Sequence, residues 1–197
     1  YFSNDEDSRQ YNVLEPPLGL MALQTYVDAK LGDKVQTKLS KSLIDFDSFE
    51  KLLELVNDYK PDLIGVRAMT FYSGFFHDGI AFLRDNGIDI PIISGGPYPT
   101  ASYSDILNDR NIDLCAIAEG EITLVEILEA MLKNNKKFPN KRKLKEIEGI
   151  AFYNPEEINN TTEGIAAIPI SNNLSQLWES PEKKTIISWP NSKYHYK

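Results

Sequence analysis

The chain has few of the residues that most often build catalytic or metal centres. Its 197 residues include one cysteine, Cys115, and two histidines, His77 and His195. A single cysteine cannot form an internal disulfide, which favours a reducing compartment, and its apolar surroundings are typical of a buried strand residue. Neither histidine has the spacing of a metal-ligand set or of a Cys/His catalytic pair. We therefore expect no metal site and no catalytic residues in this chain.

Long hydrophobic runs and an excess of positive charge are also missing. No apolar stretch approaches the roughly 20 residues of a membrane span, and no signal segment opens the chain. Acidic residues outnumber basic ones by 29 to 21, so the net charge is −8. This balance disfavours nucleic acids and anionic membranes as partners. The composition predicts a cytoplasmic protein that binds neither nucleic acid nor membrane.

Short apolar runs alternate with amphipathic stretches along the first two thirds of the chain. This pattern predicts strands at 35–41, 62–66, 90–94 and 113–117. It predicts helices at 18–30, from a capping box at Asp47 and Glu50 to a stop at 60–61, from about 71 to 86–87, at 103–108 and at 121–133. Such alternation is typical of an α/β fold with a flavodoxin-like (Rossmann-like), doubly wound parallel sheet. The first strand of that order is either short and unrecognised or upstream of Tyr1.

The composition changes after residue 134. Residues 136–145 form a basic run without interleaved aromatics, which we interpret as a solvated linker. Two short apolar runs, 149–153 and 164–170, predict a β-hairpin. The aperiodic tail that follows indicates an extended connector. We therefore divide the chain into an α/β domain at 1–134 and a segment at 135–197 that contains the linker, hairpin and connector.

Three unusual turns each follow a predicted strand, and the carboxyl ends of parallel strands are where open α/β sheets bind ligands. The two glycines of the second turn allow a close approach of backbone to a flat ligand. No G-x-G-x-x-G fingerprint or P-loop is present, which weakens a nucleotide interpretation. The candidate binding residues in these turns are Arg67, Ala68, Met69 and Thr70; Gly95, Gly96, Pro97, Tyr98 and Thr100; and Glu119, Gly120, Glu121 and Thr123.

Four sequence elements in this order resemble the cobalamin-binding domain found at the N-terminus of many radical S-adenosylmethionine enzymes. They are Pro16-Pro17-Leu18-Gly19-Leu20, Pro61-Asp62-Leu63-Ile64-Gly65, Gly95-Gly96-Pro97 and Glu119-Gly120-Glu121-Ile122-Thr123. The resemblance implies that cobalamin is the ligand, with its nucleotide tail among the three turns. It also implies that the leading region, with Asn12, Pro17, Leu18 and Gly19, approaches the corrin.

The same resemblance implies a radical domain of the same parent chain as a partner. That domain would hold S-adenosylmethionine and a 4Fe-4S cluster through three cysteines, which this chain lacks. Residues 1–17 contain no histidine to replace the lower base at cobalt, so the resemblance implies base-off binding without histidine ligation. The chain alone would be non-catalytic, and methyl transfer or related radical chemistry would need the absent domain.

Two other readings of the sequence stay open. One is a flavodoxin-like module that binds another ligand or a protein partner. This reading lacks support for two reasons. The phosphoacceptor residues of a receiver domain are not visible, and neither is the Ser/Thr-rich phosphate loop that a flavin carrier should have early in the chain. The other is a small complete enzyme, for which Glu119 and Glu121 are the sole candidate pair.

Overall fold

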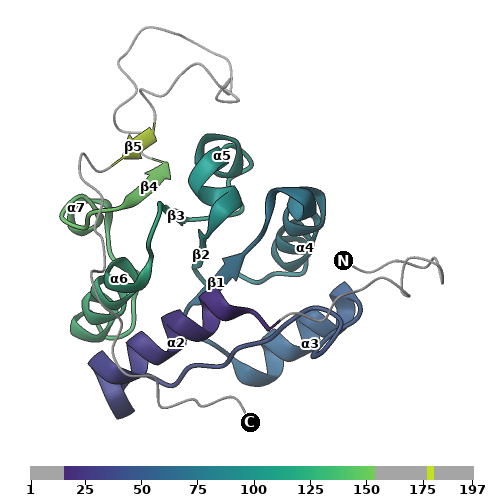
Figure 1. The fold of residues 1–197 in the computed structure, drawn as a ribbon, viewed down its shortest axis with the longest axis horizontal. Helices are drawn as coiled ribbons and strands as arrows, with labels where there is room; N and C mark the ends of the chain where they lie inside the picture. The colour runs from purple at the N-terminus through teal and green to yellow at the C-terminus, as the bar shows by residue number, and fades with distance from the viewer. Residues whose placement is uncertain (1–15, 154–176, 180–197) are drawn as a thin grey trace, which may run out of the picture.

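The computed structural model describes residues 16–153 and 177–179, and helices and strands alternate between residues 49 and 133 (Figure 1). The strands are β1 (Ile64–Arg67), β2 (Ile92–Gly95), β3 (Leu114–Ala116), β4 (Ile150–Tyr153) and β5 (Leu177–Glu179). The helices are α2 (Leu18–Leu31), α3 (Phe49–Tyr59), α4 (Ser73–Asp85), α5 (Pro97–Asn108), α6 (Glu121–Lys133) and α7 (Lys141–Leu144), with short 3-10 turns η1 (Gly32–Lys34) and η2 (Thr70–Tyr72). None of these described helices is long and apolar enough to cross a membrane.

The strands form one sheet in the order β1-β2-β3-β4-β5. β1, β2 and β3 are parallel, with Arg67 beside Gly95 and Ser94 beside Cys115. β4 and β5 continue the sheet in antiparallel orientation. The predicted α/β, Rossmann-like fold is confirmed, and its parallel part is extended by two antiparallel strands.

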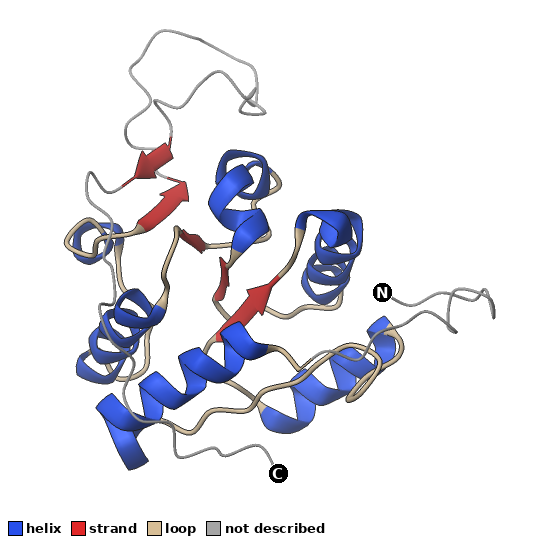
Figure 2. Cartoon of the chain, in the orientation of Figure 1, coloured by secondary structure: helices blue, strands red, loops and turns tan. Residues whose placement is uncertain are grey.

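Helices cover both faces of this sheet, as Figure 2 shows. Because side chains alternate along a strand, neighbouring residues enter opposite cores. One core contains Ile92 and Cys115 together with Phe76 of α4 and Ile106 of α5. The other contains Ile93, Leu114, Ile150 and Phe152 together with Ile127 of α6 and Leu144 of α7. Apolar residues on both faces explain why these strands read as continuous hydrophobic runs.

The predicted strand at 35–41 is wrong. Residues 35–41 form neither strand nor helix, and the nearest β-type contact is an isolated bridge between Ser42 and Phe46. β1 is the edge of the described sheet, so this segment has no strand beside it. Side chains use its carbonyl groups instead: Tyr59 Oη donates to the Gln36 carbonyl at 3.3 Å, and Gln24 Nε2 donates to that of Thr37 at 3.5 Å.

The predicted hairpin pairs 149–153 with 164–170, and residues 164–170 lie outside the described residues. Within the described residues, β4 lies between β3 and β5, and Phe152 pairs with Trp178. β4 joins the main sheet because Ile150 and Phe152 are almost fully buried in the core shared with α6. The division of the chain at residue 134 stays a prediction.

Two helix starts differ from the sequence interpretation. α5 begins at Pro97 instead of residue 103, with a non-helical residue, Ser102, inside it. Proline suits the first position of a helix because the N–H that it lacks would have no partner within the helix there. α3 is capped by Ser48, whose hydroxyl accepts from the Lys51 amide at 3.2 Å, while Asp47 forms an exposed ion pair with Lys51.

Candidate functional site

The three predicted turns lie side by side at the carboxyl ends of β1, β2 and β3. The Tyr98 amide donates to the Ala68 carbonyl at 3.3 Å, which joins the first turn to the second. The Ala118 amide donates to Thr100 Oγ1 at 3.0 Å, which joins the second turn to the loop that leads into Glu119. Parallel strands produce this convergence, because their carboxyl ends share one edge of the sheet.

Arg67 occupies the space between two glycines at this edge. A Cβ atom added to Gly96 would lie 2.9 Å from Arg67 Cγ, and one added to Gly19 would lie 3.4 Å from Arg67 Nε. Gly96 also has a φ of +96°, a conformation that L side chains rarely adopt. The start of α2 and the β2–α5 turn therefore approach the same arginine side chain.

The guanidinium group of Arg67 is exposed and lacks a carboxylate partner within the described part of the chain. Its Nη2 atom donates to Met69 Sδ at 3.6 Å. An arginine without a counter-ion offers a planar set of donors to an anion. This site thus carries a positive charge in a chain whose net charge is −8.

Large exposed apolar side chains occur in the two segments next to this charge. Phe71 is 92% exposed, and Met69, Tyr72 and Leu18 are also exposed. Three of these residues belong to the segment after β1, and Leu18 begins α2 beside Gly19. Exposed apolar groups gathered at one place are a common mark of a binding surface.

The third turn is more buried than the first. Glu119 is exposed, whereas Glu121, the first residue of α6, is only 5% exposed and its Oε2 atom has no hydrogen-bond partner. Burial raises the pKa of Glu121, its own backbone amide lowers it, and the charge of Glu119 raises it further. In its protonated form this carboxyl group can donate as well as accept a hydrogen bond.

Thr123 is fully buried, and its hydroxyl donates to the Glu148 carbonyl at 3.0 Å. Neither Glu121 nor Thr123 caps α6, because Gly120 is the N-cap of this helix and no side chain caps it. Of the other predicted residues, Pro17 precedes α2 and its carbonyl accepts from the Met21 amide at 3.0 Å. Asn12 lies outside the described residues.

Tyr98 directs its hydroxyl into the protein instead of toward a ligand. Its Oη lies 2.8 Å from His77 Nε2, and His77 Nδ1 lies 2.7 Å from Asp109 Oδ2. The Tyr98 ring is packed edge-on against Phe76 and is 8% exposed. Sequence reasoning missed this cluster, because its members are 21 and 32 residues apart and no periodic pattern connects them.

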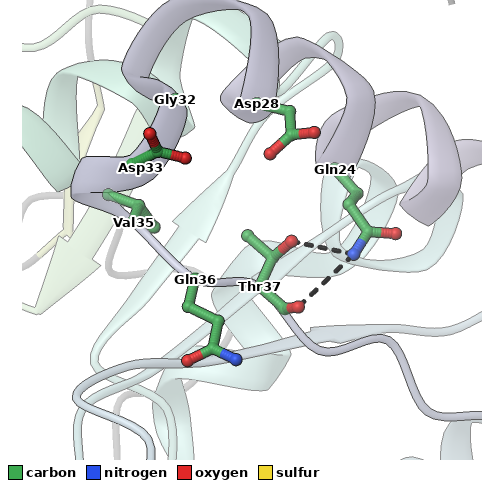
Figure 3. Close-up of a pocket in the computed structure, with 7 residues that line it drawn as sticks. All are labelled: Gln24, Asp28, Gly32, Asp33, Val35, Gln36 and Thr37. Carbon is green, nitrogen blue, oxygen red and sulfur yellow. Dashed lines mark hydrogen bonds between the residues drawn. The ribbon is translucent and has the colours of Figure 1, made fainter. Parts of the chain in front are cut away.

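A separate cavity of about 400 Å³ lies along the other end of α2 (Figure 3). It contains none of the predicted site residues. Inside it, Gln24 Nε2 donates to Thr37 Oγ1 at 2.8 Å. Its lining residues are Gln24, Asp28, Gly32, Asp33, Val35, Gln36 and Thr37.

Residues 10–128, which include all three turns, match the model of a protein family described as the B12 binding domain. The chain belongs to this family. Its match spans more than half of the chain and ends inside α6. The family resemblance inferred from the four sequence elements is thereby confirmed.

Two relatives of this B12-binding domain are anaerobic magnesium-protoporphyrin IX monomethyl ester cyclases. The protein from Synechocystis sp. is 33% identical over 78 residues, which are 39% of this chain and 14% of that relative. The protein from Cereibacter sphaeroides is 26% identical over 154 residues, which are 78% of this chain and 23% of that relative. The chain therefore matches less than a quarter of the length of either relative.

A solved structure shares the fold of this B12-binding domain. It is the cobalamin-dependent S-adenosylmethionine radical enzyme OxsB with aqua-cobalamin and S-adenosylmethionine bound. The TM-score is 0.62 at 14% identity, over 90% of this chain and 21% of that one. This likeness supports the α/β assignment, since at such low identity only the fold is comparable.

The residues at the strand ends fit the chemistry of cobalamin. The cofactor has a flat corrin, amide side chains and a nucleotide tail with an anionic phosphodiester. The site offers a cation at Arg67, an unpartnered buried oxygen at Glu121, and backbone without side chains at Gly95 and Gly96. Both ring nitrogens of His77, the histidine within the described residues, are already engaged by Asp109 and Tyr98.

Proposed function

We propose that the chain holds cobalamin at the carboxyl ends of β1, β2 and β3. The observation that carries this proposal is Arg67, an exposed guanidinium without a carboxylate partner among the described residues, at the strand edge matched by the B12-binding family model. Arg67 pairs with the phosphodiester of the cofactor tail, and the glycine backbone of the second turn lies against the cofactor. The remaining binding residues are those predicted from the three turns and from Asn12, Pro17, Leu18 and Gly19.

We further propose that the cofactor binds base-off and without a protein imidazole at cobalt. His77 supports this, because its Nδ1 and Nε2 atoms lie 2.7 Å and 2.8 Å from Asp109 and Tyr98 and neither is left to coordinate a metal. The electron paramagnetic resonance spectrum of the bound cob(II)alamin tests this point. We expect no splitting from an axial nitrogen, and a nitrogen splitting would contradict base-off binding without histidine.

The parent protein in this proposal is a cobalamin-dependent radical S-adenosylmethionine enzyme. The relatives and OxsB, of which this chain spans 14% to 23%, support that assignment. A radical domain elsewhere in the parent chain holds S-adenosylmethionine and the 4Fe-4S cluster. Cobalamin supplies methyl transfer or related radical chemistry there, and the residues of this chain bind and orient it. A cytoplasmic location belongs to the same proposal.

The test is retention of a corrin absorption spectrum after incubation with hydroxocobalamin and desalting. We expect the wild-type chain to stay coloured and an Arg67→Gln variant to lose most of the colour. Arg142→Gln, which removes an exposed arginine on α7, is the matched control and should behave like the wild type. A colourless wild-type protein with a native circular dichroism spectrum would refute the proposal and favour a module for another ligand.

A further inference from the structure

We propose that His77 is a positioning residue for the cofactor site: Asp109 orients its imidazole, which holds Tyr98 and so fixes the β2–α5 turn against the loop after β1. This inference rests on the function proposed above. It concerns a histidine on α4 that lies outside all three sequence turns and does not touch the cofactor in our account.

The direction of the hydrogen bonds follows from the acceptor at one end. An ionised carboxylate can only accept, so Asp109 Oδ2, 2.7 Å away, places the proton of a neutral His77 on Nδ1. Nε2 then carries a lone pair and accepts from Tyr98 Oη at 2.8 Å. In this neutral form Tyr98 is the donor, and its phenol is held at a single orientation.

Tyr98 transmits this constraint to the site through its backbone. It lies in the first turn of α5, directly after Gly96 and Pro97, and its amide donates to the Ala68 carbonyl at 3.3 Å. Ala68 immediately follows Arg67, the residue that packs against Gly96. The phenol and the amide of one residue thus link α4, the second turn and the first turn.

The packing around the phenol leaves it little freedom to move. Its ring meets Phe76 edge-on with centroids 5.7 Å apart at 90°, and it meets the His77 ring at 79°. Burial and the carboxylates of Asp105 and Asp109 raise the pKa of Tyr98, so the hydroxyl keeps its proton. The side chain therefore serves as an anchor inside the protein, and the part of Tyr98 that faces the site is its backbone.

Two variants remove the same hydrogen bond from opposite sides. Tyr98→Phe deletes the donor, and His77→Asn keeps a donor for Asp109 while it deletes the acceptor for Tyr98. Tyr59→Phe is the matched control, because it also removes one tyrosine hydroxyl that donates a hydrogen bond, in this case to the Gln36 carbonyl at 3.3 Å, away from the site. We expect each of the first two variants to raise the dissociation constant for hydroxocobalamin roughly three- to tenfold, and the double variant to raise it no further.

Amide hydrogen exchange in the protein without cobalamin separates positioning from general stability. We expect both variants to accelerate exchange of the Tyr98 amide selectively, while the Ile88 amide, which donates to Leu83 at 3.0 Å, stays protected. An Ile127→Ala variant, which weakens the opposite core, should change both amides together.

The outcomes are distinguishable. Unchanged protection of the Tyr98 amide would overturn the inference regardless of cobalamin. Selective loss of protection with an unchanged dissociation constant would overturn it as well. If the wild-type chain binds no cobalamin, the proposed function fails, and exchange at Tyr98 still decides whether His77 joins the two turns.

Discussion

A methyl group on Gly96 would lie 2.9 Å from Cγ of Arg67, closer than side-chain carbons approach one another in folded proteins. Gly96→Ala therefore combines backbone strain at a φ of +96° with displacement of Arg67. We expect it to weaken cobalamin retention and to lower the free energy of unfolding. Urea unfolding and desalting after incubation with hydroxocobalamin measure the two effects.

Gly87→Ala is the matched control for this change. Gly87 has a φ of +82°, but nothing lies within 4 Å of a Cβ added there. Gly87→Ala should lower the free energy of unfolding by about 1–2 kcal/mol from backbone strain alone. Gly96→Ala should lower it by about 1–3 kcal/mol more because of overpacking. Equal losses at the two positions would show that Arg67 does not fill the space beside Gly96.

Glu121 predicts a pH dependence of stability. Burial raises its folded-state pKa, so the folded protein binds this proton more tightly than the unfolded chain. The contribution of Glu121 to the free energy of unfolding is therefore largest at low pH, and it falls as pH rises from the ordinary glutamate pKa toward the raised pKa of the folded state. Glu121→Gln should remove this fall, as urea titrations at several pH values can measure.

Glu146→Gln provides the contrast. Lys143 lowers the pKa of Glu146, so any stabilisation from that carboxylate is present above the ordinary glutamate pKa and lost as pH falls. The two substitutions should change the pH profile in opposite directions. The same change from both would contradict a raised pKa for the buried Glu121 carboxyl group.

Cys115 should be unreactive in the folded protein. It is fully buried, and burial raises the pKa of its thiol to about 12, although the Ser94 hydroxyl 3.1 Å away partly opposes this. Thiolate is the reactive form, so iodoacetamide should label the native chain only after unfolding. An Ala101→Cys variant, with an exposed thiol on α5, should be labelled at once at that position alone. Rapid labelling of Cys115 would show that the β2–β3 core opens readily.

The buried face of α6 should contribute far more to stability than its outer face, because the buried face packs into the core with Ile93 and Leu114. Ile127 is fully buried, whereas Leu132 on the same helix is 39% exposed. Ile127→Ala should lower the free energy of unfolding by about 2–5 kcal/mol, and Leu132→Ala should lower it by much less. Chemical denaturation checks both, and similar losses would contradict the assigned burial.

The sequence predicted the elements whose evidence is local. The apolar stripe of 121–133 and the short runs that became β1, β2 and β3 have periods that depend only on neighbouring residues. The segment at 35–41 failed because a strand also needs a partner, and the described sheet ends at β1. The sequence did not predict that β4 lies beside β3, because this placement depends on the burial of Ile150 and Phe152 in a core completed by residues distant in sequence.

The candidate site also has one part that the local sequence predicts and another that only the folded structure shows. The turns at 67–70, 95–100 and 119–123 could be located because each follows a recognisable strand and parallel strands end at one edge. The contact of Arg67 with Gly19 and Gly96, and the bonds of His77 to Tyr98 and Asp109, join residues distant in sequence. Such contacts leave no local pattern, so only the folded chain reveals them.

The most direct test of the account is to map the amide chemical-shift changes that hydroxocobalamin causes in an isotope-labelled chain. We expect the largest changes at residues 67–70, 95–100 and 119–123, around the exposed guanidinium of Arg67. Changes concentrated instead at the cavity between Gln24 and Thr37, or no saturable changes in a folded chain, would contradict a cobalamin site at the carboxyl ends of β1, β2 and β3.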